Sequence, residues 1–134
     1  MATITATYLG DLRTTATHTK SGDTLTTDAP TDNRGKGEAF SPTDLVATAL
    51  GTCVLTVMGI KARDADIDMD GATVSVQKTM GSNPRRILKL EVTVQMPDRD
   101  YTGREQQQLT RAAHYCPVDN SLHPDMEVVI EVLF

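Results

Sequence analysis

Polar and hydrophobic residues alternate over much of the first 27 residues, which is the pattern of β-strands. The stretches 3–8, 12–19 and 24–27 are rich in β-branched residues, and turn residues at 10–11 and 21–23 separate them. Ten of the chain's 20 threonines fall before residue 28. β-Branched side chains fit extended, pleated backbone. This part of the chain is therefore predicted to form a three-stranded meander, followed by a long loop at 28–40.

A long apolar helix is predicted next, over residues 42–62. Ser41 is a good N-cap, Pro42 suits the first helical position, and Asp44 complements the dipole in the first turn. The run 45–60 is apolar on nearly every side. Such a helix, about 30 Å long, is expected to be buried all round. One small sheet cannot cover it, so we expect a second subunit to do so.

The second half alternates between strand and helix patterns. Strands are predicted at 72–80 and 87–96, forming a hairpin around the turn 81–84. Thr102 and Glu105 fit a capping box, and the helix they open is expected to end near Tyr115, before Pro117. A short helical turn within 117–124 and a closing strand at 126–134 complete the order βββ-α-ββ-α-β. The prediction is a single α+β domain over residues 1–134.

Composition and charge exclude several classes of function. The chain has 134 residues and a net charge of −5, which argues against binding nucleic acid or an anionic membrane surface. The first residues lack the pattern of a signal peptide, and no uninterrupted apolar stretch is long enough to suggest a transmembrane helix. We therefore expect a cytoplasmic protein. The two cysteines, Cys53 and Cys116, are then expected to be free, catalytic or metal-binding rather than a structural disulfide.

The residues alone leave the roles of the cysteines open. Cys53 lies in the middle of the apolar helix, where it is either a small core residue or a thiolate that needs an arginine from elsewhere. Cys116 lies before a proline at a predicted helix end, which suits a resolving cysteine or a structural one equally. His114 and Cys116 do not have a common zinc spacing, so no metal site is expected. Phosphate-binding glycine motifs are absent, so nucleotide binding has no support.

Two segments resemble the OsmC/Ohr family, in its broader OsmC-like branch. The first is SPTDLVATALGTC, residues 41–53, in which a proline precedes a cysteine by eleven residues. The second is HYCPVDNSL, residues 114–122. The predicted element order also matches that family. The resemblance implies an intertwined homodimer and a thiol-dependent peroxidase without a cofactor. Its substrates would be organic hydroperoxides or hydrogen peroxide. A dithiol or a redox protein would return the oxidised enzyme to its reduced form.

The resemblance also assigns roles to residues. Cys53 would be the peroxidatic cysteine and Cys116 the resolving one. Arg13 lies where the family carries an arginine that stabilises the thiolate, and Glu38 is the carboxylate expected to orient it. Thr43 stands where Ohr-type members have glutamate and cannot carry the charge, so Asp44 is the fallback carboxylate after Glu38. The rival arginines are Arg34 and Arg111.

Two further expectations concern the substrate and the alternative function. An apolar wall suited to an alkyl hydroperoxide is predicted, although the same residues are equally typical of a core: Leu50, Val54, Val57 and Met58. The alternative to a peroxidase is a non-catalytic or small-molecule-binding protein on the same scaffold, with vestigial thiols.

Overall fold

The computed structural model describes residues 1–134 and shows two compact units, residues 1–46 and 47–134, within the range predicted as one domain. The predicted order βββ-α-ββ-α-β is confirmed. The short helical turn predicted within 117–124 is also present, as α3 (Pro117–Asn120), and the structure adds a 3₁₀ helix, η1 (Thr31–Asn33), in the long loop. The mixed α+β class is also confirmed.

The first unit contains an antiparallel sheet of three strands, β1 (Ile4–Gly10), β2 (Arg13–His18) and β3 (Thr24–Asp28), in that order. The tight turn between β2 and β3 sets the register that places Arg13 opposite Asp28. The buried side chains of this unit are Thr27, Asp28 and Ser41, all of them polar. Its sheet therefore lacks an apolar core of its own.

The long helix α1 (Pro42–Asp64) begins with a reciprocal cap. The Ser41 hydroxyl accepts the Asp44 N–H at 3.0 Å, and the Asp44 carboxylate accepts the Ser41 N–H at 2.9 Å. Two backbone donors that the first turn leaves without helical partners are thereby satisfied. The predicted start of this helix is confirmed, and its end lies two residues beyond the predicted one.

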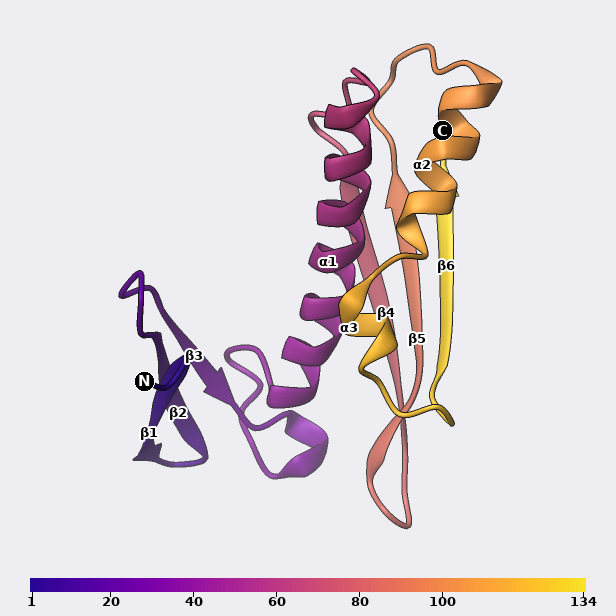
Figure 1. The fold of residues 1–134 in the computed structure, drawn as a ribbon. Helices are drawn as coiled ribbons and strands as arrows, with labels where there is room; N and C mark the ends of the chain where they lie inside the picture. Colours follow the sequence, from indigo (N-terminus) through magenta and orange to yellow (C-terminus); the bar gives the residue numbers. More distant parts are fainter. The chain divides into compact units, whose positions relative to one another are not determined.

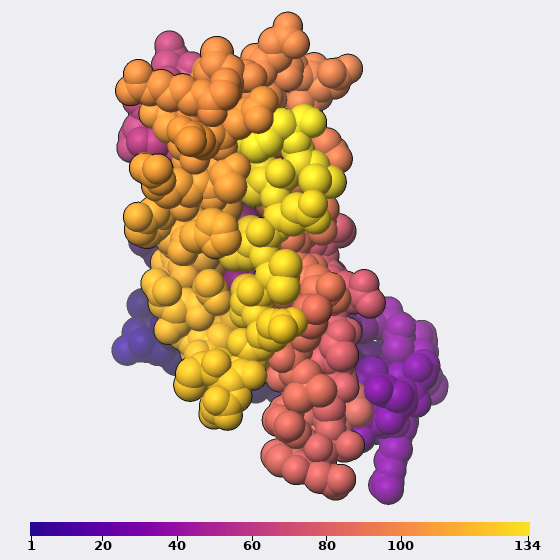
Figure 2. Space-filling model, turned by 90° about the vertical axis from the view of Figure 1, so that its right-hand side faces the viewer, coloured from indigo at the N-terminus to yellow at the C-terminus, as the bar shows by residue number.

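The second unit is built on a sheet of the order β4–β5–β6, with β4 (Thr73–Gly81), β5 (Arg86–Gln95) and β6 (Glu127–Leu133). β4 and β5 form the predicted antiparallel hairpin, whereas β5 and β6 are parallel. Parallel neighbours need a crossover connection. Here the helix α2 (Gly103–Ala113) supplies it (Figure 1). Figure 2 shows α2 alongside β6 on one face of the molecule.

The core of this unit lies between the helices and one face of the sheet. Alternate residues of β5, Leu90, Val92 and Val94, have at most 1% of their surface exposed. The helices contribute fully buried side chains, namely Leu50, Val54 and Met58 from α1 and Leu109 and Ala113 from α2. The opposite face of the sheet is polar, and Lys89 there pairs with Glu91 and Glu127. The sheet thus has one apolar face and one polar face.

Within the single chain, α1 is buried on one side only, as expected if one small sheet cannot cover it. That a second subunit covers the other side stays a prediction. The buried residues of α1 form one stripe against the sheet: Ala47, Leu50, Gly51, Val54, Met58 and Ala62. The opposite side, which includes Thr52, Thr56 and Ile60, is exposed. By length and composition alone α1 could cross a membrane, but the core helix of a folded domain passes the same test.

Candidate active site

The second unit brings its two cysteines together. Cys53, in the middle of α1, is half-buried, whereas Cys116 is fully buried where α2 ends and α3 begins. Both are free thiols. Cys116 is the N-cap of α3, and its sulfur accepts the Asp119 N–H at 3.4 Å. Pro117 favours this geometry, because the residue before a proline is restricted to extended backbone, and Cys116 has that conformation. The cap fixes the sulfur atom at the junction of the two helices.

The environment of Cys116 favours a neutral thiol. Burial raises the pKa of Cys116, and a hydrogen bond with the Cys53 side chain raises this pKa further. The backbone N–H groups of Asp119 and Val118 act in the opposite direction but do not outweigh burial. The two thiols are therefore close enough for Cys53 to raise the pKa of Cys116, the more exposed thiol lying on α1 and the buried one at the start of α3. An oxidised Cys53 would find its disulfide partner already in place.

A hollow of about 270 Å³ lies between α1 and the end of α2. Its lining is Val57, Ile60, Lys61, Asp64, Ala112 and Tyr115. Val57 is one helical turn beyond Cys53, on the same side of α1, and Tyr115 precedes Cys116. The hollow is thus mostly apolar, with Lys61 and Asp64 as its charged members.

The predicted substrate wall needs correction. Leu50, Val54 and Met58 have no exposed surface, because they face the sheet within the core. They are core residues of this chain, and no substrate reaches them without disrupting that packing. Val57 is the one member of the predicted set that lines a surface hollow.

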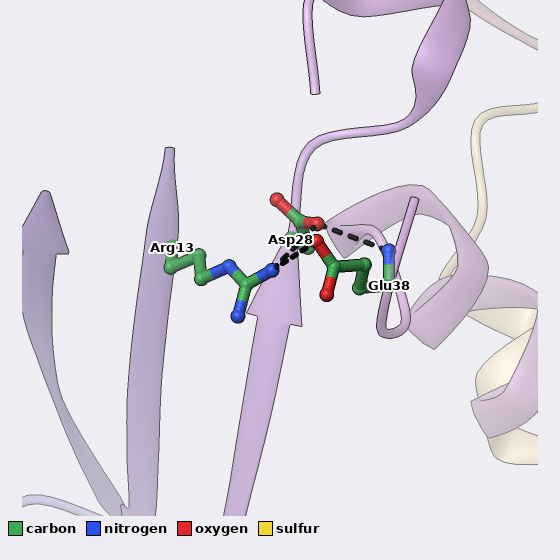
Figure 3. A network of polar contacts seen from close by, with 3 residues as sticks. All are labelled: Arg13, Asp28 and Glu38. Atoms are coloured by element: carbon green, nitrogen blue, oxygen red, sulfur yellow. Dashed lines mark hydrogen bonds and ion pairs between the residues drawn. The ribbon is translucent and has the colours of Figure 1, made fainter. Parts of the chain in front are cut away.

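The first unit holds a cluster of one arginine and two carboxylates (Figure 3). The Arg13 guanidinium, at the start of β2, lies 2.7 Å from Glu38 Oε1 and 3.7 Å from Asp28 Oδ2. The Glu38 N–H donates to the same Asp28 oxygen at 3.0 Å. The hydrogen bond with Glu38 is the main reason that the pKa of Arg13 is raised above its ordinary value. The predicted pairing of Arg13 with Glu38 is therefore present.

Asp28 belongs to this cluster and was missed by the sequence analysis. A signal for it existed. Counting outward along both strands from a turn centred between Lys20 and Ser21 pairs residue 13 with residue 28. An aspartate opposite an arginine is a natural partner for an ion pair, but the sequence pattern placed residue 28 at the start of the loop.

The two substitute residues lie elsewhere in the first unit. Asp44 completes the cap of α1 described above. Arg34 is exposed after η1, with a left-handed backbone at φ 68°. Arg111, the remaining rival, is exposed on α2 in the second unit. No group of three or more histidine, cysteine, aspartate or glutamate side chains is arranged to hold a metal ion.

Comparison with known proteins agrees with these features. The model of the family described as OsmC-like protein matches residues 35–131. A protein of Psychrobacter arcticus 273-4, for which a role in osmotic stress and detoxification is proposed, is 45% identical. Its structure has a TM-score of 0.93, and the match covers 98% of this chain and 96% of that one. No curated protein matches.

More distant structures share the fold. An organic hydroperoxide resistance protein, OsmC, from Legionella pneumophila is 16% identical, with a TM-score of 0.76 over 100% of this chain and 98% of that one. A further organic hydroperoxide resistance protein, from Elizabethkingia anophelis with thiocyanate bound, is 20% identical, with a TM-score of 0.75 over 99% and 96%. With the paired thiols, the cluster around Arg13 and the family match over most of its length, the chain belongs to the OsmC-like protein family.

Proposed function

We propose that the protein is a thiol-dependent peroxidase that reduces organic hydroperoxides. The observation that carries this proposal is that two free thiols of different accessibility, Cys53 and Cys116, lie near enough in one unit for Cys53 to raise the pKa of Cys116. Family membership supports it, since two proteins of the same fold are named for organic hydroperoxide resistance. A cytoplasmic location, where reductants keep both thiols reduced between turnovers, is part of the proposal.

The first step is oxidation of Cys53. Its thiolate attacks the distal oxygen of the hydroperoxide, the O–O bond breaks, and the leaving alkoxide takes a proton to become an alcohol. Cys53 is left as a sulfenic acid. We assign the charge that favours the thiolate to Arg13, from its match to the family pattern. Glu38 presents that guanidinium in a fixed orientation within the first unit.

The second step uses Cys116. Its sulfur displaces the hydroxyl of the Cys53 sulfenic acid, so that a disulfide forms and water leaves. A dithiol, small or protein-borne, then reduces the disulfide by exchange and is itself oxidised to a disulfide. All three steps balance without a metal or prosthetic group.

The apolar hollow between α1 and α2 gives the organic group of the substrate a place to bind. Val57 and Ala112 offer apolar surface one turn or less from the thiols along the chain. Hydrogen peroxide has no group that would use this surface. We therefore expect alkyl or aryl hydroperoxides to be consumed faster than hydrogen peroxide.

Peroxide consumption by the purified protein with a dithiol tests the proposal. Cys53→Ser is expected to abolish turnover, since serine offers no oxidisable sulfur. Cys116→Ser is expected to allow one oxidation of Cys53 and then, in excess peroxide, over-oxidation to the sulfinic acid, visible by mass spectrometry.

Two results would contradict the proposal. Equal loss of the first oxidation event in both variants would overturn the assignment of roles. Wild-type protein that consumes no hydroperoxide would favour the non-catalytic alternative with vestigial thiols.

A further inference from the structure

Asp28 is a buried carboxylate in a unit that buries little else. It ends β3, opposite Arg13 at the start of β2, and only 1% of its surface is exposed. Placing a charge out of water is costly unless that charge is paired. The contacts of this carboxylate therefore indicate what its charge acts on.

Asp28 ties the loop before α1 to the end of β3. Its Oδ2 atom accepts the Glu38 N–H at 3.0 Å, and its own backbone N–H donates to the Phe40 carbonyl at 3.0 Å. Thr27 and Phe40 also form a parallel bridge. Residues 38–40 are thereby held against β3, and the Glu38 side chain is brought to the guanidinium of Arg13 (Figure 3).

The ion pair with Glu38 alone would fix the Arg13 side chain only weakly. The side chains of Arg13 and Glu38 are 34% and 56% exposed. Exposed ion pairs contribute little to stability, because water screens them and two long side chains must be ordered. The short contact of 2.7 Å between them thus depends on the backbone of Glu38 being fixed, which is what Asp28 does.

The second oxygen of Asp28 indicates that this carboxylate does more than anchor the loop. Its Oδ1 atom is buried without a hydrogen-bond partner, which is an unfavourable arrangement. An asparagine could accept the Glu38 N–H with less cost of burial. The negative charge of Asp28 instead attracts Arg13, whose guanidinium lies 3.7 Å from Oδ2.

We propose that Asp28 is a positioning residue of the peroxidase reaction: it fixes Glu38 by its backbone and Arg13 by its charge, so that the guanidinium has one orientation. This inference rests on the proposed function, in which Arg13 favours the Cys53 thiolate. The charged groups that act on Arg13 are Glu38, Asp28 and, more weakly, Asp11. Asp28 is the buried one among them.

The test is the pH dependence of Cys53 alkylation, measured without peroxide on the full-length protein with Cys116 replaced by serine. Asp28→Asn keeps the size of the side chain and an acceptor for the Glu38 N–H. If Asp28 positions Arg13, the midpoint moves to higher pH by about half a unit or more, equal to a roughly threefold loss of thiolate. Removal of a nearby negative charge without any positioning would instead move the midpoint to lower pH. A lower or unchanged midpoint therefore overturns the inference.

Two controls isolate the effect. Asp23→Asn removes the same charge from the β2–β3 turn, at the other end of the sheet, and is expected to leave the midpoint unchanged. In an Arg13→Ala background, Asp28→Asn is expected to have no further effect, since a positioning residue acts through its target. A full shift in that background would contradict the inference.

A third readout does not involve Cys53 at all. Asp28→Ala removes the acceptor of the Glu38 N–H and is expected to accelerate hydrogen exchange at that amide about tenfold or more, with the core strand β5 still protected. Unchanged exchange would contradict the anchoring role. Failure of the peroxidase proposal shows instead as wild-type protein that consumes no hydroperoxide, or as an Arg13→Ala variant whose own alkylation profile is unchanged.

Discussion

Cys53 and Cys116 differ in access to solvent, and in the proposed reaction this difference would decide which of them reacts with a hydroperoxide first. Cys53 is half-buried on a regular helix, whereas Cys116 is fully buried beneath it as the cap of α3. Burial of a thiol in apolar surroundings disfavours its charged form. In the proposed reaction, Cys116 would therefore stay a neutral thiol until the sulfur of Cys53 is oxidised.

The raised pKa of Cys116 predicts how the stability of the reduced protein depends on pH. In the folded state Cys116 holds its proton more tightly than in the unfolded state, where the pKa of a cysteine thiol is about 8.5. The contribution to stability is fully present below that pH and is lost as pH rises through the folded value. We expect the urea midpoint of the reduced protein to fall above about pH 8.5.

Cys116→Ser is the matched variant for this effect. Serine is a good N-cap and does not titrate in this range. The fall of the urea midpoint above about pH 8.5 should be shallower in this variant than in the wild type at the same protein concentration. Parallel curves for the two proteins would show that Cys116 is not the titrating group.

The sequence named candidate residues that carry a local pattern and left out Asp28, whose place in the cluster around Arg13 depends on strand register. Cys53, Cys116, Arg13 and Glu38 were all named from the two motifs and the family resemblance. Asp28 was not, because its role arises from its position opposite Arg13 and from its burial. The apolar wall was misplaced for a related reason. Periodicity on a helix that is apolar all round does not tell which side meets the sheet.

At the scale of elements, Gly51 marks a point of close approach between α1 and β4. A Cβ atom there would lie 2.8 Å from Val76 Cγ2 and 3.4 Å from Val74 Cγ1. Valine is stiff at χ1, and β4 is held by β5, so these methyl groups have little room to move. The glycine lets the helix lie directly on the sheet, and Cys53, two residues later, takes its place from that contact.

Gly51→Ala is therefore expected to destabilise the protein. Overpacking costs about 1–3 kcal/mol, and the higher helix propensity of alanine returns up to about 1 kcal/mol. The net loss should be about 1 kcal/mol in urea unfolding. Gly59→Ala is the control on the same helix, where a Cβ atom meets nothing within 4 Å. That variant should be more stable by about 0.5–1 kcal/mol. Equal stabilisation by both changes would refute the close approach at Gly51.

Element type and order were predictable because each strand and helix carries its own local signal. The capping box at Thr102 and Glu105 and the cap by Ser41 and Asp44 both form as the sequence indicates. The extent of burial was not predictable from the same signals. Whether the outer side of α1 is covered depends on what packs there, which no local pattern specifies.

At the scale of the whole molecule, the single chain leaves much apolar surface in contact with water. The first unit buries no apolar side chain and exposes seven large ones by 44% or more: Met1, Ile4, Tyr8, Leu9, Leu12, Leu25 and Phe40. On α1, the hydroxyls of Thr52 and Thr56 donate to backbone carbonyls of the same helix, so their methyl groups add to the apolar surface near Ile60. A three-stranded sheet needs an apolar face that is covered to be stable.

This exposed surface is the basis for a last prediction, that the protein is a tight homodimer with α1 at its centre. Light scattering at micromolar concentration should give twice the chain mass of 14.5 kDa. Ile60 is 57% exposed, so Ile60→Asp would place a charge in an apolar interface and shift the equilibrium toward monomer. Gln107→Asp, on the exposed side of α2, should leave the mass unchanged. A wild-type protein that is monomeric at micromolar concentration would contradict the prediction. A dimer unaffected by Ile60→Asp would place the interface away from α1, since an aspartate buried there could not keep its charge without a partner.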